Sequence, residues 1–210
     1  MRVLIVAKTR MGSGACIGGI TETGESVRLV PLNADPHEGA NREYEVGDVW
    51  EITGEPETSL TPPHNENFVV HSKSRIYRMD DSRELIRAIE LLMPPKFGDP
   101  LQLYEGLLQT TSIGSLYVPP GRDVPPYSTM FWKTDKQLTL ETDKKKNLCY
   151  RYPTENGGFT LTFVGFQKPL KTIPADTLLR VSLHIGGDHK IDHTLNCAAM
   201  CKSLDGFLKR

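Results

Sequence analysis

The chain has 210 residues, of which 38% are hydrophobic, so it can bury one large or two small globular cores. Its 25 basic and 26 acidic residues give a net charge of −1, which excludes a strong overall basic field but allows a local basic patch. No apolar segment approaches the length of a membrane span, and four scattered cysteines do not make a disulfide framework, so we expect a cytoplasmic protein with reduced thiols that does not contact a membrane.

The first thirty residues predict a three-stranded meander, as at the start of a small barrel. Residues 3–7 form an apolar run that is typical of a buried strand, and glycine-containing turns follow it. Residues 25–30 alternate polar and apolar side chains, as a half-buried strand does. After a loop from Pro31 to Glu43, further short strands are predicted within residues 44–53 and 67–77.

The hydrophobic period changes from two to 3.6 near residue 80. Ser82–Met93 carries apolar residues at helical spacing, and Asp81 or Ser82 can cap the helix. A second short helix is predicted over Pro100–Gln109, because proline is favoured at the first helical position. These two segments predict a helical insert between two β regions.

Strand patterns return after residue 113. They occupy residues 115–118, 137–141, 147–152, 159–164 and 178–184, and a proline-rich loop follows the first of them. The last segment, residues 191–208, fits either a helix or a strand followed by a short helix. The fold class is therefore mainly β with a helical insert, and the predicted domains are two small β-barrels at 1–79 and 113–210, with 80–112 as the insert.

Several short segments together resemble one family, the prokaryotic dual OB-domain proteins. They are Val3–Arg10, Cys16–Ile20, Arg28–Pro31, Gly47–Ile52, His64–Val70 and Leu179–Leu183. The resemblance implies two OB-like barrels and, by analogy, binding of nucleic acid or of a nucleotide. The C-terminal segment, with its histidines and cysteines, departs from the family pattern.

Lys8, Thr9, Arg10 and Arg28 form the first candidate ligand site. A strand end followed by a glycine turn offers backbone N–H groups beside several cations, and such groups bind phosphate. If these cations face a common groove, Arg28→Ala should weaken binding more than loss of a turn lysine such as Lys145. The alternative is a solvated strand end.

His64, Glu66 and Asn67 form the second candidate ligand site, in a loop that enters a strand. Imidazole, carboxylate and amide groups can hold a base edge or support acid–base chemistry, although turn chemistry alone also explains this composition. No complete catalytic motif and no nucleotide-cofactor fingerprint is present. We therefore predict no catalytic residues and no cofactor.

Aromatic residues beside cations are a further feature, because OB barrels stack single-stranded bases on aromatic rings. The candidates are Tyr77 beside Arg75 and Arg78, Trp132 beside Lys133, and Tyr150 and Tyr152 around Arg151. Alternation puts Tyr150 and Tyr152 on one face of a strand, which favours a role in the core over a stacking role.

His189, His193, Cys197 and Cys201 recur every four residues, a pattern that suggests zinc ligands. On one helix these residues would extend over about 18 Å, far more than a coordination sphere with bonds of about 2.0–2.3 Å. We therefore predict no metal site.

These patterns predict a non-catalytic binding module for single-stranded nucleic acid or a nucleotide, with a basic groove on the N-terminal barrel. One alternative is an enzyme that acts on a nucleotide-like or phosphorylated substrate at Arg28, His64 and Glu66. Another is a subunit that binds a protein partner within a larger assembly.

Overall fold

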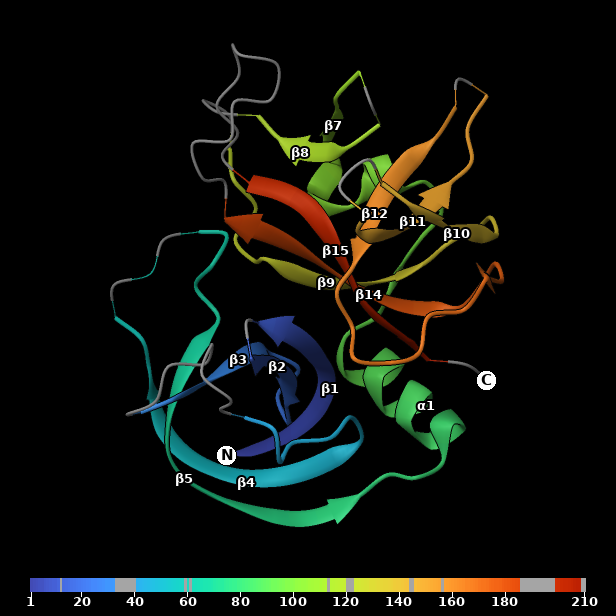
Figure 1. Ribbon diagram of the computed structural model, residues 1–210. Helices are drawn as coiled ribbons and strands as arrows, with labels where there is room; N and C mark the ends of the chain where they lie inside the picture. Colours follow the sequence, from blue (N-terminus) through green and yellow to red (C-terminus); the bar gives the residue numbers. More distant parts are fainter. Residues whose placement is uncertain are drawn as a thin grey trace. The chain divides into compact units, whose positions relative to one another are not determined.

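The chain folds into two compact units, which are described separately (Figure 1). The first unit comprises Met1–Thr61, Asn65–Pro94 and Leu208–Arg210, and the second comprises Pro62–His64 and Pro95–Phe207. The computed structural model describes residues 1–11, 13–32, 41–58, 60, 62–112, 114–119, 123–143, 146–155, 157–185 and 199–208. Among these residues, no helix is long and apolar enough to cross a membrane.

Five strands of the first unit close into a barrel. They are β1 (Arg2–Met11), β2 (Gly14–Thr21), β3 (Ser26–Pro31), β4 (Asp48–Pro56) and β5 (Asn67–Arg78). Their order around the barrel is β1-β2-β3-β5-β4, and β3 and β5 are parallel while the other pairs are antiparallel. This arrangement confirms the predicted N-terminal meander and the OB-like architecture.

Inward-facing side chains of these strands fill the barrel. The core consists of Val3, Ile5, Ala15, Ile17, Leu29, Tyr44, Trp50 and Ile52. Tyr44 lies outside the strands, yet its ring is packed 4.9 Å from that of Trp50, centroid to centroid. The segment that precedes β4 therefore contributes to the core.

Helix α1 (Ser82–Leu92) confirms the predicted first helix. The Asp81 carboxylate accepts a hydrogen bond from the Arg83 backbone N–H, as an N-cap residue does. The helix buries three apolar side chains, Leu85, Ile86 and Ile89. It lies close to the β2–β3 turn, where a Cβ on Gly24 would lie 2.6 Å from the Leu92 carbonyl oxygen.

The predicted second helix, Pro100–Gln109, is wrong. Two single-turn 3₁₀ helices, η1 (Pro100–Gln102) and η2 (Tyr104–Gly106), replace it, and Leu103 between them is extended. The buried hydroxyl of Tyr104 donates to the backbone oxygens of Ser128 and Val181. These distant partners hold Tyr104 at a φ of +51°, which no regular helix allows.

The second unit is mainly β, as predicted. Its strands are β6 (Lys96–Phe97), β7 (Gln109–Thr110), β8 (Leu116–Val118), β9 (Thr129–Lys133), β10 (Leu138–Thr142), β11 (Leu148–Tyr152), β12 (Phe159–Phe163), β13 (Thr172–Ile173), β14 (Leu178–Ile185) and β15 (Ala199–Leu208). The main order is β13-β10-β11-β12-β15-β14-β9-β6, and β8 pairs with β7 and β15. Strand β9, which sequence patterns did not predict, lies between β14 and β6 and contributes Met130 and Trp132 to the core.

The three aromatic residues of the second unit that were candidates for base stacking are core residues. Trp132, Tyr150 and Tyr152 are almost fully buried. Their polar atoms are hydrogen-bonded internally: the Trp132 indole donates to the Gly98 carbonyl, and the Tyr152 hydroxyl donates to Asp135. The preference for a core role of the two tyrosines is confirmed, and Trp132 is excluded as a stacking residue.

The C-terminal segment contains a strand. Ala199–Leu208 forms β15, which pairs in parallel with β12 and antiparallel with β8. Three of the proposed zinc ligands, at positions 189, 193 and 197, lie outside the described residues. Within the part of the chain that is described, no three His, Cys, Asp or Glu side chains are grouped so as to hold a metal ion. Cys16 and Cys149 are free thiols.

Candidate functional site

A bulge in β1 decides where the Lys8 side chain points. Val3 and Ile5 point into the barrel, and the pairing of β1 with β2 then shifts between Ile5 and Ala7. Lys8 therefore lies opposite Ile17, a core residue, and directly opposed residues of antiparallel strands share a face. Lys8 points inward at the barrel end, where its side chain is only 12% exposed.

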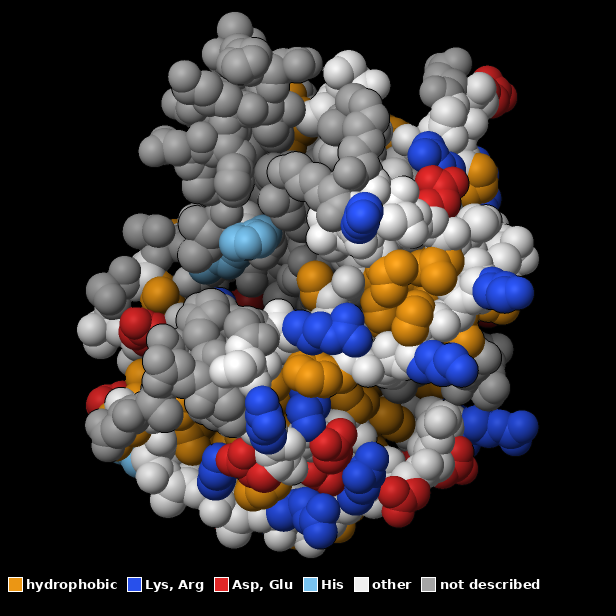
Figure 2. Space-filling view, viewed as in Figure 1, with side chains coloured by type: hydrophobic (Ala, Val, Ile, Leu, Met, Phe, Trp, Pro, Cys, Tyr) orange, Lys and Arg blue, Asp and Glu red, His pale blue; other side chains and the backbone are white. Residues whose placement is uncertain are grey.

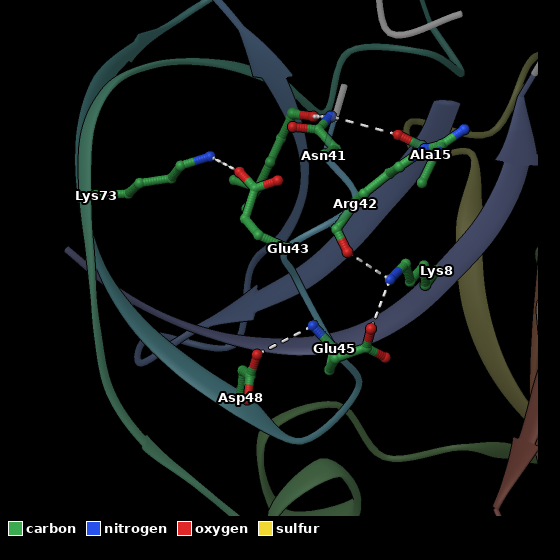
Figure 3. Close-up of polar contacts among 9 residues, drawn as sticks. Lys8, Ala15, Asn41, Arg42, Glu43, Glu45, Asp48 and Lys73 are labelled. Carbon is green, nitrogen blue, oxygen red and sulfur yellow. Dashed lines mark hydrogen bonds and ion pairs between the residues drawn. The ribbon is translucent and has the colours of Figure 1, made fainter. Parts of the chain in front are cut away.

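The Lys8 ammonium group is bound by the segment that precedes β4 (Figure 3). It donates to the backbone oxygen of Arg42 at 2.8 Å and to the Glu45 carboxylate at 2.7 Å. In the same segment, the Asn41 amide donates to the backbone oxygen of Ala15 at 3.3 Å. We call residues Asn41–Glu45 the strap, because its contacts attach it to several strands at this end of the barrel.

The opposite side of the strap is attached to β5. Lys73 forms an ion pair with Glu43, and its ammonium group lies 4.4 Å from the centroid of the Tyr44 ring. Partial burial tends to raise the pKa of Glu43, but the hydrogen bond from Lys73, a backbone hydrogen bond and the charges of Lys73 and Lys8 lower it overall. The cations at this barrel end are thus matched by acidic residues of the strap.

Arg28 has a different environment on the outer face of β3. Its neighbours Val27 and Leu29 pack against the barrel core, so alternation turns Arg28 outward. In the sheet Arg28 lies between Gly18 of β2 and Asn67 of β5. Its side chain is half-buried, and its guanidinium makes no hydrogen bond or ion pair with any residue that the structure describes.

The β4–β5 loop is closed beside Arg28. The Arg28 backbone N–H donates to the Glu66 carbonyl at 2.7 Å. Asn67 donates through its side-chain amide to the Glu57 carboxylate at 2.7 Å, and the Glu57 N–H donates to the Asn67 carbonyl at 3.1 Å. Glu66 and Asn67 therefore help to shape the loop next to Arg28. His64 is half-buried and is grouped with the second unit.

The remaining predicted residues of β1 divide between the two faces. Thr9 lies opposite Cys16 on the outer face, and Arg10 lies opposite the core residue Ala15. The structure therefore brings Thr9, Arg28 and Asn67 to the outer face and separates them from Lys8 and Arg10. The predicted cations do not all face one groove.

Sequence reasoning missed the two acids of the strap. Glu43 ends the segment that was assigned as a loop, and Glu45 was not considered as a partner of Lys8. The available signal was the pattern Glu43-Tyr44-Glu45, in which an aromatic residue between two acids follows a polar loop. This pattern is too common to identify the two lysines that the acids bind.

Comparisons with known proteins identify the family. Residues 1–193 match the family model described as a dual OB-containing domain. No curated protein matches the chain. Among solved structures, the tetrameric p202 HIN2 is 10% identical with a TM-score of 0.31, covering 97% of this chain and 86% of that one. The Ifi202 HINa domain in complex with 20bp dsDNA is 10% identical with a TM-score of 0.35, covering 94% and 89%.

A third solved structure, a murine DNA binding protein bound with ds DNA, is 8% identical with a TM-score of 0.32. It covers 96% of this chain and 98% of that one. TM-scores this low do not indicate a shared function.

Proposed function

Since this chain belongs to the dual OB-containing domain family, we propose that it is a non-catalytic module that binds single-stranded nucleic acid or a nucleotide on the outer face of its N-terminal barrel. The observation that carries the proposal is the half-buried guanidinium of Arg28, which has no acidic partner among the described residues. Such a group is well suited to bind a phosphate in two parallel hydrogen bonds.

The position of Arg28 in the barrel supports the proposal. OB folds bind oligonucleotides on the face of their second and third strands and with the loops β1–β2 and β4–β5. Here Arg28 lies on β3, and Thr9 lies near the β1–β2 turn. Glu66 and Asn67 end the β4–β5 loop and flank Arg28.

The neighbours of Arg28 in the sheet differ on its two sides. On one side lie the small residues Gly18 and Ala7, which are both buried. On the other side lies the partly exposed Asn67, whose amide is bound to Glu57. A phosphate at Arg28 would thus lie toward the fixed amide of Asn67.

Because the charges of the chain are nearly balanced, the local contact with Arg28 should contribute more to the affinity for a polyanion than the electric field of the whole protein. Figure 2 shows acidic and basic side chains intermixed over the lower part of the visible face, and the chain as a whole has a net charge of −1. Long-range attraction of a polyanion is therefore weak. Affinity should depend on a small number of local contacts, with a salt slope of about −0.7 for each phosphate neutralised on a single strand.

The experiment is a binding titration of a fluorescent single-stranded oligonucleotide with the full chain at several salt concentrations. Arg28→Ala should weaken binding by about tenfold or more, because a charge-assisted hydrogen bond contributes about 1.5–3 kcal/mol. The matched control is Arg87→Ala on the exposed side of α1, which removes the same charge elsewhere. Competition by a mononucleotide distinguishes a nucleotide site from a strand site.

Two results would contradict the proposal. One is equal loss of affinity in the two arginine variants, which would mean that only the total charge matters. The other is an absence of binding to any oligonucleotide or nucleotide at low salt.

A further inference from the structure

Strand β5 continues well beyond the strand that closes the barrel. β3 pairs with β5 only from Asn67 to Val70, whereas β4 pairs with it as far as Arg78. From residue 71 onward, one edge of β5 has no strand partner among the described residues. Residues 71–78 are all exposed. The barrel therefore has an open, solvent-facing extension.

Two β-bulges decide which side chains of this extension face outward. The register between β4 and β5 shifts at two places, which leaves His71 and Ile76 as extra residues on β5. Beyond the second shift, Tyr77 lies opposite Val49. Val49 neighbours the inward-facing Trp50, so Val49 and Tyr77 both face outward. Tyr77 therefore shares the outer face of the barrel with Arg28.

The side chains at the end of β5 combine apolar surface with positive charge. Tyr77 is 50% exposed and Ile76 is 45% exposed. The side chains of Arg75 and Arg78 are 57% and 43% exposed. Each has an acidic neighbour, at 3.7 Å in Asp48 and 3.3 Å in Asp80. Arg75 lies opposite the inward-facing Trp50 and Arg78 opposite Asp48, so both arginines start from the face of β5 opposite to that of Tyr77.

The charges beside the strand indicate on which side phosphates would lie. Glu51 and Glu55 of β4 are exposed and lie opposite Ser74 and Val69, on the outer face. These carboxylates would repel phosphates on the β4 side. The free edge of β5 has no acidic residue within the strand, so a polyanion would follow that edge.

The same edge is poorly suited to a protein strand. Bulges and basic side chains on an edge strand disfavour pairing with another chain. An exposed ring on a strand that also carries cations is instead a combination that can hold a single-stranded base while the cations attract its phosphates. From this we infer that Tyr77 stacks a base of a single-stranded nucleic acid that follows the outer face of β5 away from Arg28. This inference rests on the proposed function.

The length of the strand predicts how long that nucleic acid must be. Ten residues separate Asn67, beside Arg28, from Tyr77, which is at most about 33 Å along a strand. A stacked strand rises about 3.4 Å per nucleotide, so this distance corresponds to about 10 nucleotides, or to about half as many in an extended strand. Both lengths fall within the range of about 4–16 found for single OB folds. A short oligonucleotide bound at Arg28 would not reach Tyr77.

The experiment compares oligothymidylates of about 3 and about 15 nucleotides. The shorter cannot reach Tyr77 from Arg28 even when it is extended, and the longer lies in the upper part of that range. Tyr77→Ala should weaken binding of the long probe at least about fivefold and leave the short probe unchanged. Tyr77→Phe should bind both probes as the wild type does, because it keeps the ring. Phe97→Ala, which removes a 64% exposed ring from β6, is the matched control and should have no effect.

The outcomes separate the inference from the proposed function. If the wild type binds both probes and Tyr77→Ala binds the long one equally well, the inference is wrong while the proposed function stands. An equal loss for both probes, or a loss in Tyr77→Phe as large as in Tyr77→Ala, also overturns it, because neither fits stacking at a distant position. Failure of the wild type to bind any probe refutes strand binding by the proposed site, and the inference with it.

Discussion

Replacement of Lys8 by methionine tests whether this lysine stabilises the barrel or binds the ligand. The change keeps most of the side-chain volume and removes the charge and both hydrogen bonds, to Arg42 and Glu45. The bond to the Arg42 carbonyl has a charged donor that is only 12% exposed, so its loss costs about 1.5–3 kcal/mol. The Glu45 carboxylate is 49% exposed, so the ion pair adds at most about 1 kcal/mol.

We therefore expect Lys8→Met to lower the free energy of unfolding of the first unit by about 2 kcal/mol, or its Tm by about 8–16 °C for a unit of this size. Hydrogen exchange of peptides from β1 and the strap should accelerate, while peptides from the second unit should not. The control is Lys136→Met in the second unit, where an exposed lysine also donates to a backbone oxygen, that of Pro153 at 3.2 Å. Its effect should stay below about 1 kcal/mol.

One result would refute this reasoning. If Lys8→Met left stability and exchange unchanged but weakened oligonucleotide binding tenfold, Lys8 would be a ligand contact and the strap would not depend on it. Loss of stability with unchanged affinity at a temperature where both proteins are folded would assign Lys8 to the barrel.

The remaining predictions concern the strap and the thiols. The lowered pKa of Glu43 means that its stabilising effect is present above the unfolded value of about 4.3 and is lost as the pH falls through the lower, folded value. Glu43→Gln should therefore reduce the loss of stability between neutral and acidic pH, as measured by urea unfolding; an unchanged acid loss would contradict this. Asn41→Ala should destabilise the first unit by about 1–3 kcal/mol in the same assay, because the amide is buried and bound to two backbone oxygens. A change near zero would mean that these hydrogen bonds do not stabilise the unit. Burial, followed by the charges of Glu141 and Asp143, raises the pKa of Cys149. In alkylation at pH 8 followed by peptide mass spectrometry, Cys149 should therefore react more slowly than the half-buried Cys16, and equal rates would contradict this.

The sequence by itself determined the elements whose signals are local. The glycine turns and alternating side chains of the first thirty residues predicted β1, β2 and β3, and the capped, amphipathic segment at Ser82 predicted α1 to within one residue of its end. The alternation of Val27, Arg28 and Leu29 also predicted that Arg28 lies on the face opposite the core. Each of these signals depends on residues a few positions apart, so it can be recognised in the sequence without knowledge of distant contacts.

Only the tertiary structure decided the absence of the predicted second helix and the presence of β9 in the second unit. The apolar residues after Pro100 have helical spacing, but the hydroxyl of Tyr104 binds backbone oxygens 24 and 77 positions away and holds a non-helical turn. Strand β9 follows a proline-rich stretch and is buried almost throughout, so it shows no alternation. Both outcomes depend on contacts that local propensity does not contain.

The separation of Lys8 from Arg28 was likewise decided in three dimensions. A strict period of two would have carried the inward pattern of Val3 and Ile5 on to Ala7 and left Lys8 outside, on one face with Arg10 of the predicted site. The bulge between Ile5 and Ala7 belongs to the pairing of β1 with β2, not to either strand alone, and it turns Lys8 inward. There the lysine meets Arg42 and Glu45, which lie 34 and 37 positions away and come together with it only because the barrel closes.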